Sequence, residues 1–94
     1  MIYTKATQYI INPEKMKGFI DYLYVFTQKT RMQETNLSFE YGIQADDKIL
    51  VIERWSNFNE FDKFIKNPEF AKELQTLLKM SKAVNVIYQL SINR

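Results

Sequence analysis

Residues 36–56 read NLSFEYGIQADDKILVIERWS and predict two strands joined by a short turn. In residues 36–44 apolar and polar side chains alternate, which is typical of a strand with one buried face. The apolar side of this strand holds Leu37, Phe39, Tyr41 and Ile43. Residues 45–48 have the composition of a turn. Residues 49–56 begin with an unbroken apolar run and end in ERWS, so the segment predicts a hairpin at the centre of the chain.

The chain before this hairpin predicts a strand and then a helix. Residues 2–11 alternate and are rich in β-branched and aromatic side chains. Asn12 and Pro13 follow, and this pair is typical of a helix start because Asn caps free N–H groups and Pro lacks one. Apolar side chains then recur at helical spacing: Met16, Phe19, Ile20, Leu23 and Phe26.

The chain after the hairpin predicts an interrupted helix and a last strand. Asn57 and Glu60 have the spacing of a helix-capping box, and Asn67-Pro68 ends the first helical piece and starts a second. Residues 83–92 alternate again. This alternation predicts that one face of the last strand carries Val84, Val86, Tyr88, Leu90 and Ile92.

The predicted order of elements is β-α-β-β-α-β. This order, with two crossover helices and a central hairpin, predicts an α+β, ferredoxin-like fold with a four-stranded antiparallel sheet and both helices on one face. No linker or repeat interrupts it, so we expect residues 1–94 to form a single domain. The run Ile49-Leu50-Val51-Ile52 is apolar on both faces of its strand. A second copy of the sheet would cover the face opposite the helices, and we therefore expect a homodimer through that face.

Composition excludes several chemistries. The 94 residues contain no His and no Cys, which removes thiol nucleophiles, Cys-based zinc sites and the Ser-His-Asp triad. No metal site is expected from the scattered carboxylates. The net charge is only +2 and no basic run is present, so we expect no nucleic-acid partner, although the RNA-recognition motif shares this order of elements. No apolar run is long enough to span a membrane, and a cytoplasmic protein is expected.

Two short stretches carry a family resemblance. Residues 36–40 (NLSFE), followed by Glu53-Arg54-Trp55-Ser56, resemble the antibiotic biosynthesis monooxygenase family, in which an aromatic–acid pair precedes a Glu-x-Trp motif at the end of the third strand. The resemblance implies a dimeric α+β barrel with an aromatic-lined pocket between each sheet and its helices. It also implies oxidation of quinol-like or anthrone-like aromatics by molecular oxygen, with no cofactor.

Relatives within the same superfamily differ in activity, so the resemblance does not name a substrate. Some degrade haem with a His in the helix after Glu-x-Trp. Residues 62–65 read DKFI here, so haem degradation is not expected. Others are isomerase-type proteins that process small signalling metabolites.

Glu53 and Trp55 are the first candidate site residues. They lie two positions apart on a strand, so both side chains point to the same face. A carboxylate in an apolar pocket has a raised pKa, and Glu53 could then take a proton from a phenol or hydroquinone. An ion pair with a Lys or Arg is the alternative for Glu53. Trp55 could stack on a planar ligand with its N–H free to bind an oxygen, or it could be a core ring.

A hairpin loop of two or four residues would place Glu40 directly opposite Glu53. Two carboxylates there would repel, so that they would share a proton or bind a cation, and Glu40 is the second candidate catalytic residue. A three-residue loop with a bulge would separate the two.

The remaining candidates would bind substrate. Asn36 is one of them by its position in the resemblance, although a turn at the strand entry also explains it. The strand tyrosines Tyr9, Tyr41 and Tyr88 could orient a polar ligand or pack in the core.

We therefore expect a monooxygenase that oxidises a small phenolic or quinol-type aromatic, with a carboxylate as base. The alternatives are a non-catalytic binding or sensing protein on the same barrel and an isomerase-type enzyme acting on a small signalling metabolite.

Overall fold

A computed structural model describes residues 1–93 of the protein. A single 3₁₀ turn, η1 (Pro13–Lys15), precedes the first helix. The other elements are β1 (Ile2–Ile10), α1 (Met16–Arg31), β2 (Asn36–Ala45), β3 (Lys48–Trp55), α2 (Phe58–Lys66), α3 (Pro68–Lys79) and β4 (Ala83–Ile92). The predicted β-α-β-β-α-β order is confirmed, with the second helical segment divided in two.

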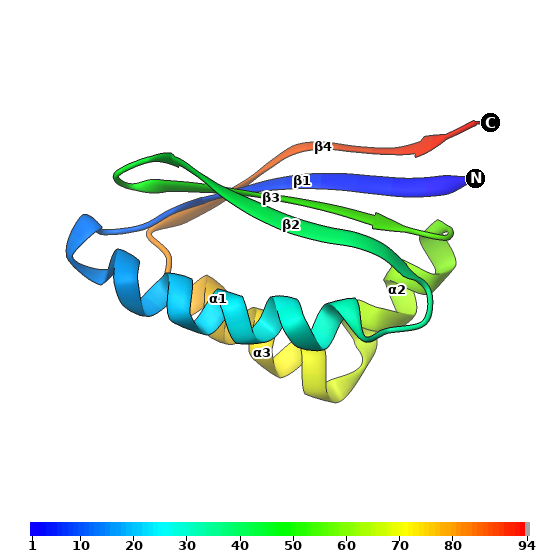
Figure 1. Cartoon of the computed structure of the whole chain (residues 1–94), viewed down its shortest axis with the longest axis horizontal. Coiled ribbons are helices and arrows are strands. Elements are labelled where there is room, and N and C mark those ends of the chain that lie inside the picture. The colour runs from blue at the N-terminus through cyan, green and yellow to red at the C-terminus, as the bar shows by residue number, and fades with distance from the viewer. Residues whose placement is uncertain (94) are drawn as a thin grey trace.

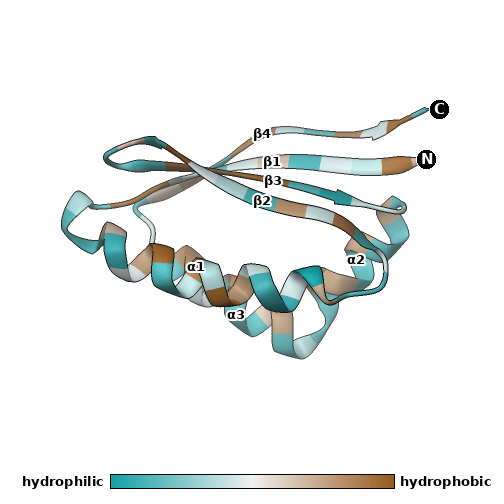
Figure 2. Ribbon diagram, viewed as in Figure 1, coloured by the Kyte–Doolittle hydropathy of each residue, from teal (hydrophilic) through white to brown (hydrophobic). Residues whose placement is uncertain are grey.

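The strands form one antiparallel sheet in the order β2-β3-β1-β4. The three α-helices form a second layer on one face of this sheet, as the ferredoxin-like prediction requires (Figure 1). β1 and β3 are therefore the central strands, and β2 and β4 are the edges. Along α1, hydrophobic and hydrophilic residues alternate with the turns of the helix (Figure 2), since only one side of the helix meets the sheet.

Asparagine side chains cap the 3₁₀ turn η1 and the helices α2 and α3, whereas α1 continues directly from η1 with no side-chain cap. The side-chain oxygen of Asn12 accepts a hydrogen bond from the backbone N–H of Glu14, at 3.0 Å. Asn57 accepts in the same way from the N–H of Glu60, at 2.9 Å. Asn67 ends α2 and caps α3, and Pro68 occupies the first turn of α3. These caps satisfy N–H groups that have no partner within the helix.

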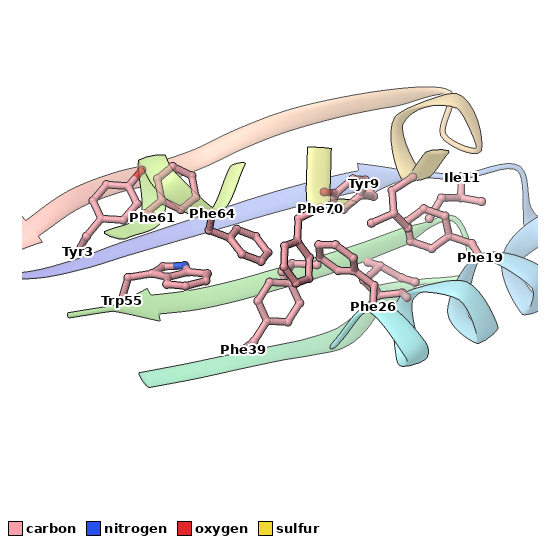
Figure 3. Close-up of a cluster of buried hydrophobic side chains, with 14 residues drawn as sticks. Tyr3, Tyr9, Ile11, Phe19, Phe26, Phe39, Trp55, Phe61, Phe64 and Phe70 are labelled. Carbon is pink, nitrogen blue, oxygen red and sulfur yellow. The ribbon is translucent and has the colours of Figure 1, made fainter. Parts of the chain in front are cut away.

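Aromatic rings make up most of the core between the sheet and the helices (Figure 3). Phe64 of α2 is central to it, because its ring centroid lies 4.6 Å from that of Trp55 and 4.5 Å from that of Phe70. Phe26 of α1 contacts Phe39, Phe64 and Phe70. Tilted and edge-to-face contacts at these separations pack the rings closely. They also bring the positive edge of one ring toward the negative face of another, which is electrostatically favourable.

The central hairpin has two irregularities, which change the expected pairing. Its register shifts between Ile43 and Ala45 near the turn, and again between Asn36 and Ser38. As a result Glu53 lies opposite Phe39, and Glu40 lies opposite Ile52. The predicted pairing of Glu40 with Glu53 is wrong, because the extra residue moves the two carboxylates to opposite faces of the sheet.

A further irregularity divides β4. Val86 pairs with Thr7 of β1, whereas Tyr88 pairs with Ala6, so Ile87 has no partner residue in the ladder. The prediction of one apolar face for this strand is therefore wrong. Val84 and Val86 lie on the helix side, and Tyr88, Leu90 and Ile92 lie on the opposite side.

The outer face of the sheet is the face opposite the helices (Figure 1). Ile52, Tyr88 and Leu90 lie on it and are 37%, 38% and 47% exposed. Apolar side chains of the central strand β3 and the edge strand β4 are therefore in contact with water on this face. Among residues 1–93, none of the helices has the length and apolar character needed to cross a membrane.

Candidate functional site

A cavity of about 310 Å³ lies between the sheet and the helices. Its aromatic walls come from four phenylalanines: Phe26, Phe39, Phe61 and Phe64. Its polar groups come from Lys5, Thr7, Tyr9, Glu53 and Gln75. An apolar cavity with a few convergent polar groups is the usual form of a small-molecule site, and this volume lies near the lower end of the range of roughly 300–1,000 Å³.

The two central strands supply most of the polar groups. Lys5, Thr7 and Tyr9 alternate along β1 and therefore project from the same face, toward the helices. Glu53 projects from β3 beside them, because Glu53 and Lys5 are direct partners in the β1–β3 ladder. This placement depends on antiparallel pairing, which brings residues 48 positions apart next to each other.

The cavity opens between α3 and the edge strand β4. Val86 lines it from β4 and is 51% exposed, and Leu78 lines it from α3 and is 42% exposed. Gln75 of α3 is also exposed. Lining residues that are half in water mark a mouth through which a ligand can enter without unfolding the sheet.

Glu53 is buried, with 7% of its surface exposed. Its Oε1 accepts a hydrogen bond of 2.9 Å from the indole Nε1 of Trp55. Among residues 1–93, neither carboxylate oxygen forms an ion pair, so the alternative of a structural ion pair is not supported. Burial raises the pKa of Glu53, and the Trp55 hydrogen bond and the positive charge of Lys5 oppose that rise.

Trp55 holds Glu53 and does not line the cavity. Its ring is 1% exposed and packs against Phe61 and Phe64. The prediction that Trp55 stacks on a ligand with a free N–H is not supported, because the ring is in the core and its N–H is bonded to the carboxylate. Its contribution to the site is to fix the orientation of Glu53.

Lys5 is a site residue that the motif-based reasoning missed. It lines the cavity opposite Glu53, and its Nζ lies 5.1 Å from the centre of the Phe61 ring, at cation–π distance. A signal for it was present in the sequence. In the alternation of the first strand, Lys5 occupies the same face as the apolar ring positions Tyr3 and Tyr9.

Of the three predicted strand tyrosines, only Tyr9 lines the cavity. Burial, and to a smaller extent the charge of Glu53, raises the pKa of Tyr9, so its hydroxyl remains a neutral donor. Tyr41 faces the helix layer opposite Val51 and packs against the core without reaching the cavity. Tyr88 projects from the outer face, on the wrong side of the sheet for this site, because the bulge at Ile87 turns it there.

Asn36 and Glu40 also lie outside the cavity. The side-chain amide of Asn36 donates to the backbone carbonyls of Ser38 and Arg54, at 3.2 and 3.3 Å. It therefore supports the bulge at the start of β2, in keeping with the structural alternative. Glu40 is exposed on the outer face.

Comparison with known proteins agrees with this architecture. The sequence profile described as "Antibiotic biosynthesis monooxygenase" matches residues 1–74. No curated protein sequence gives a significant match.

Solved structures match over nearly the whole chain. An antibiotic biosynthesis monooxygenase superimposes with a TM-score of 0.84 at 15% identity, and 100% of each chain is covered. Rv0793 from Mycobacterium tuberculosis gives 0.80 at 15% identity, again over 100% of each chain. SnoaB, a cofactor-independent oxygenase from Streptomyces nogalater, gives 0.82 at 12% identity, with 99% of this chain and 94% of SnoaB covered.

At these identities the structures demonstrate a shared fold only. The profile match covers most of the chain, and its residues include β1, α1, the central hairpin and α2, which together supply Lys5, Tyr9, Glu53 and the aromatic walls. The chain belongs to the antibiotic biosynthesis monooxygenase family.

Proposed function

We propose that the protein is a monooxygenase that oxidises a small phenolic or quinol-type aromatic with molecular oxygen and requires no cofactor. The observation that carries the proposal is the buried carboxyl of Glu53 at the wall of an aromatic cavity. One oxygen of this carboxyl is held by Trp55, and no hydrogen bond within residues 1–93 engages the other. A fixed base with a free oxygen and a raised pKa is suited to proton abstraction from a phenol.

The proposed reaction needs little from the protein beyond binding and proton transfer. Glu53 takes the hydroxyl proton, and the phenolate passes one electron to O₂. The resulting radical and superoxide combine at a ring carbon, and the proton returns from Glu53 to give a hydroperoxide. Loss of water, which removes the hydrogen of that carbon, leaves a carbonyl, so that a phenol and O₂ give a quinone and water.

The cavity limits the size and polarity of the substrate. Its volume of about 310 Å³ suits a molecule of one to three fused rings, and its phenylalanine walls favour a flat apolar body. The Tyr9 hydroxyl makes no hydrogen bond within residues 1–93 and is available to donate to a substrate oxygen. A flat ligand that fills the cavity would displace water from it, which would strengthen these polar contacts.

We also propose that two copies associate through the outer face. Exposed apolar side chains from the centre and the β4 edge of the sheet, Ile52, Tyr88 and Leu90, are available on this face. A twofold axis would place the same residues against one another, as in most homodimers.

Oxygen-electrode assays over a panel of hydroquinones and anthrones test the reaction. We expect Glu53→Gln to lower kcat/KM by about 10²–10⁴-fold, the usual contribution of a general base. Glu40→Gln is the matched control, because it removes the other candidate carboxylate from the exposed outer face. Its activity should equal that of the unmodified protein.

Equal oxygen consumption by the unmodified protein and Glu53→Gln would contradict the proposal. Thermal stabilisation by a panel compound without any product would instead support a binding or sensing protein.

A further inference from the structure

Lys5 and Glu53 form an unusual arrangement within the cavity. They are direct partners in the β1–β3 ladder, and both line the cavity. Side chains directly opposite each other in such a ladder have Cβ atoms about 4.5–5.5 Å apart. Even so, no amine–carboxylate distance between them is within 4.0 Å, whereas the exposed pairs Lys17–Asp21 and Lys66–Asp62 do meet this limit.

The Lys5 ammonium is directed toward an aromatic ring instead. Its Nζ lies 5.1 Å from the centre of Phe61, a residue that also lines the cavity. No ion pair or hydrogen bond engages this ammonium within residues 1–93. A half-buried ammonium without an anionic partner is costly, and an anion bound in the cavity would supply that partner.

Among residues 1–93, no other group that lines the cavity competes for that role. The titratable side chains that line it are Lys5, Glu53 and Tyr9, all from the two central strands. The residues that α2, α3 and β4 place around the cavity are apolar, apart from the neutral Gln75. The Tyr9 hydroxyl stays protonated, so Lys5 is the cation and Glu53 the proton acceptor at this site.

We propose that Lys5 forms an oxyanion subsite with Glu53, in which a bound phenol or hydroquinone is held as its anion. The hydroxyl proton moves to Glu53, and the phenolate oxygen that remains accepts from the Lys5 ammonium and lies beside Glu53. One negative charge passes from the carboxylate to the ligand, and no other atom or electron is transferred. The ligand class is therefore a neutral aromatic alcohol that binds as an anion.

This inference rests on the proposed function for its site and deepens it, because an electron leaves a phenolate far more readily than a neutral phenol. It assigns Lys5 two effects on the ligand. The positive charge lowers the pKa of the bound hydroxyl, and the position of the ammonium fixes where the oxygen lies. An opposite charge within about 4–6 Å typically lowers the pKa of an acid by 1–3 units.

A chromophoric phenol tests the subsite without turnover. 4-Nitrophenol and 4-nitrocatechol absorb differently as phenol and as phenolate, so the pKa of the bound probe can be read by absorbance titration at saturating protein. The titration is done without oxygen. A negative result in this titration would therefore reject the Lys5 subsite whatever the oxygen-consumption assay shows. A negative oxygen-consumption assay would reject the proposed reaction whatever the titration shows.

Lys5→Met is the informative variant, since it keeps a long apolar side chain over Phe61 and removes the charge. We expect the bound probe to have a pKa below that of the free probe in the unmodified protein and 1–3 units higher in Lys5→Met. Lys5→Arg should restore most of the lowering. Lys63→Met is the matched control, because it removes an equal charge from a lysine whose side chain is 74% exposed on α2.

The same bound pKa in the unmodified protein and in Lys5→Met would overturn the proposal. Binding of the probe as the neutral phenol, or no binding at all, would also overturn it. Circular dichroism and the Tm of each variant establish that the fold is intact, and the Lys5→Arg result distinguishes a charge effect from a packing defect.

Discussion

The indole Nε1 of Trp55 donates a 2.9 Å hydrogen bond to Oε1 of Glu53, two residues earlier on β3. Both side chains are buried on the helix side of the sheet, where Trp55 packs among phenylalanines and Glu53 reaches the cavity. This hydrogen bond therefore links a core ring directly to the candidate catalytic carboxyl. A ring that stabilises the fold also orients the carboxyl on which the proposed chemistry depends.

Trp55→Phe should separate these two roles. It keeps an aromatic ring but removes the hydrogen bond that lowers the pKa of Glu53, so that pKa should rise further. The acid limb of the pH profile of kcat/KM should move to higher pH as a result. We expect a loss of about 1–3 kcal/mol in the free energy of unfolding, from the lost bond and the smaller ring. An unmoved acid limb would show that the Trp55 contact does not tune the base.

Glu53→Gln should stabilise the protein in a pH-dependent way. Burial raises the folded-state pKa of Glu53 above its unfolded value, so between these two pH values the folded protein binds more protons than the unfolded chain. The stability of the unmodified protein therefore falls as pH rises through this window, and the deficit is complete above the folded pKa.

The variant lacks this deficit. Its free energy of unfolding should match that of the unmodified protein at pH values below the unfolded-state pKa of Glu53 and should exceed it increasingly as the pH rises above that pKa, as measured by urea unfolding. A difference that is constant with pH would contradict the assigned burial of the charge.

Phe64→Ala should severely destabilise the fold. Phe64 lies within 4.6 Å of the Trp55 ring centre and 4.5 Å of the Phe70 ring centre, so its removal opens a cavity in the core. We expect a loss of about 3–5 kcal/mol, a large share of the stability of a small domain. Tyr24→Ala, at an α1 side chain that is 55% exposed, is the control and should cost less than about 0.5 kcal/mol.

Asn36→Ala tests whether this residue is structural. The Asn36 amide bonds two backbone carbonyls beside the first bulge of β2 and does not line the cavity. Its loss should cost about 1 kcal/mol of stability and leave the KM for any substrate unchanged. A raised KM at unchanged stability would instead support the predicted contact with substrate.

Leu90→Glu tests the proposed homodimer. Leu90 is 47% exposed on the outer face, and a carboxylate there would face its own symmetry copy or neighbouring apolar groups. Light scattering coupled to size-exclusion chromatography should show a dimer for the unmodified protein and a monomer for the variant. Val25→Glu, at a 56% exposed position on α1, should leave the dimer intact. A monomeric unmodified protein would rule out the association.

The local features of this chain were predictable from its sequence. Asn12, Asn57 and Asn67 cap helices because their side chains satisfy N–H groups only a few residues away. The position of Glu53 and Trp55 on one face also follows from the strand alone, since the side-chain period of a strand is two residues.

Pairing between strands was not predictable in the same way. One extra residue near the hairpin turn sets Glu40 opposite Ile52, and one at Ile87 turns Tyr88 and Leu90 away from the helices. A bulge depends on how two strands and the layer beneath them fit together, and a shift of one residue reverses the face of every side chain that follows.

The sequence by itself determined the order of elements, the helix break at Asn67-Pro68 and a chemistry that must operate without His or Cys. The tertiary structure alone decided which polar side chains share a cavity. It brought Lys5 next to Glu53, buried the Trp55 N–H against the carboxyl, and placed Glu40 and Tyr88 on the outer face. The physical reason is that helix and strand formation depend on neighbours along the chain, whereas the composition of the site depends on register between distant segments.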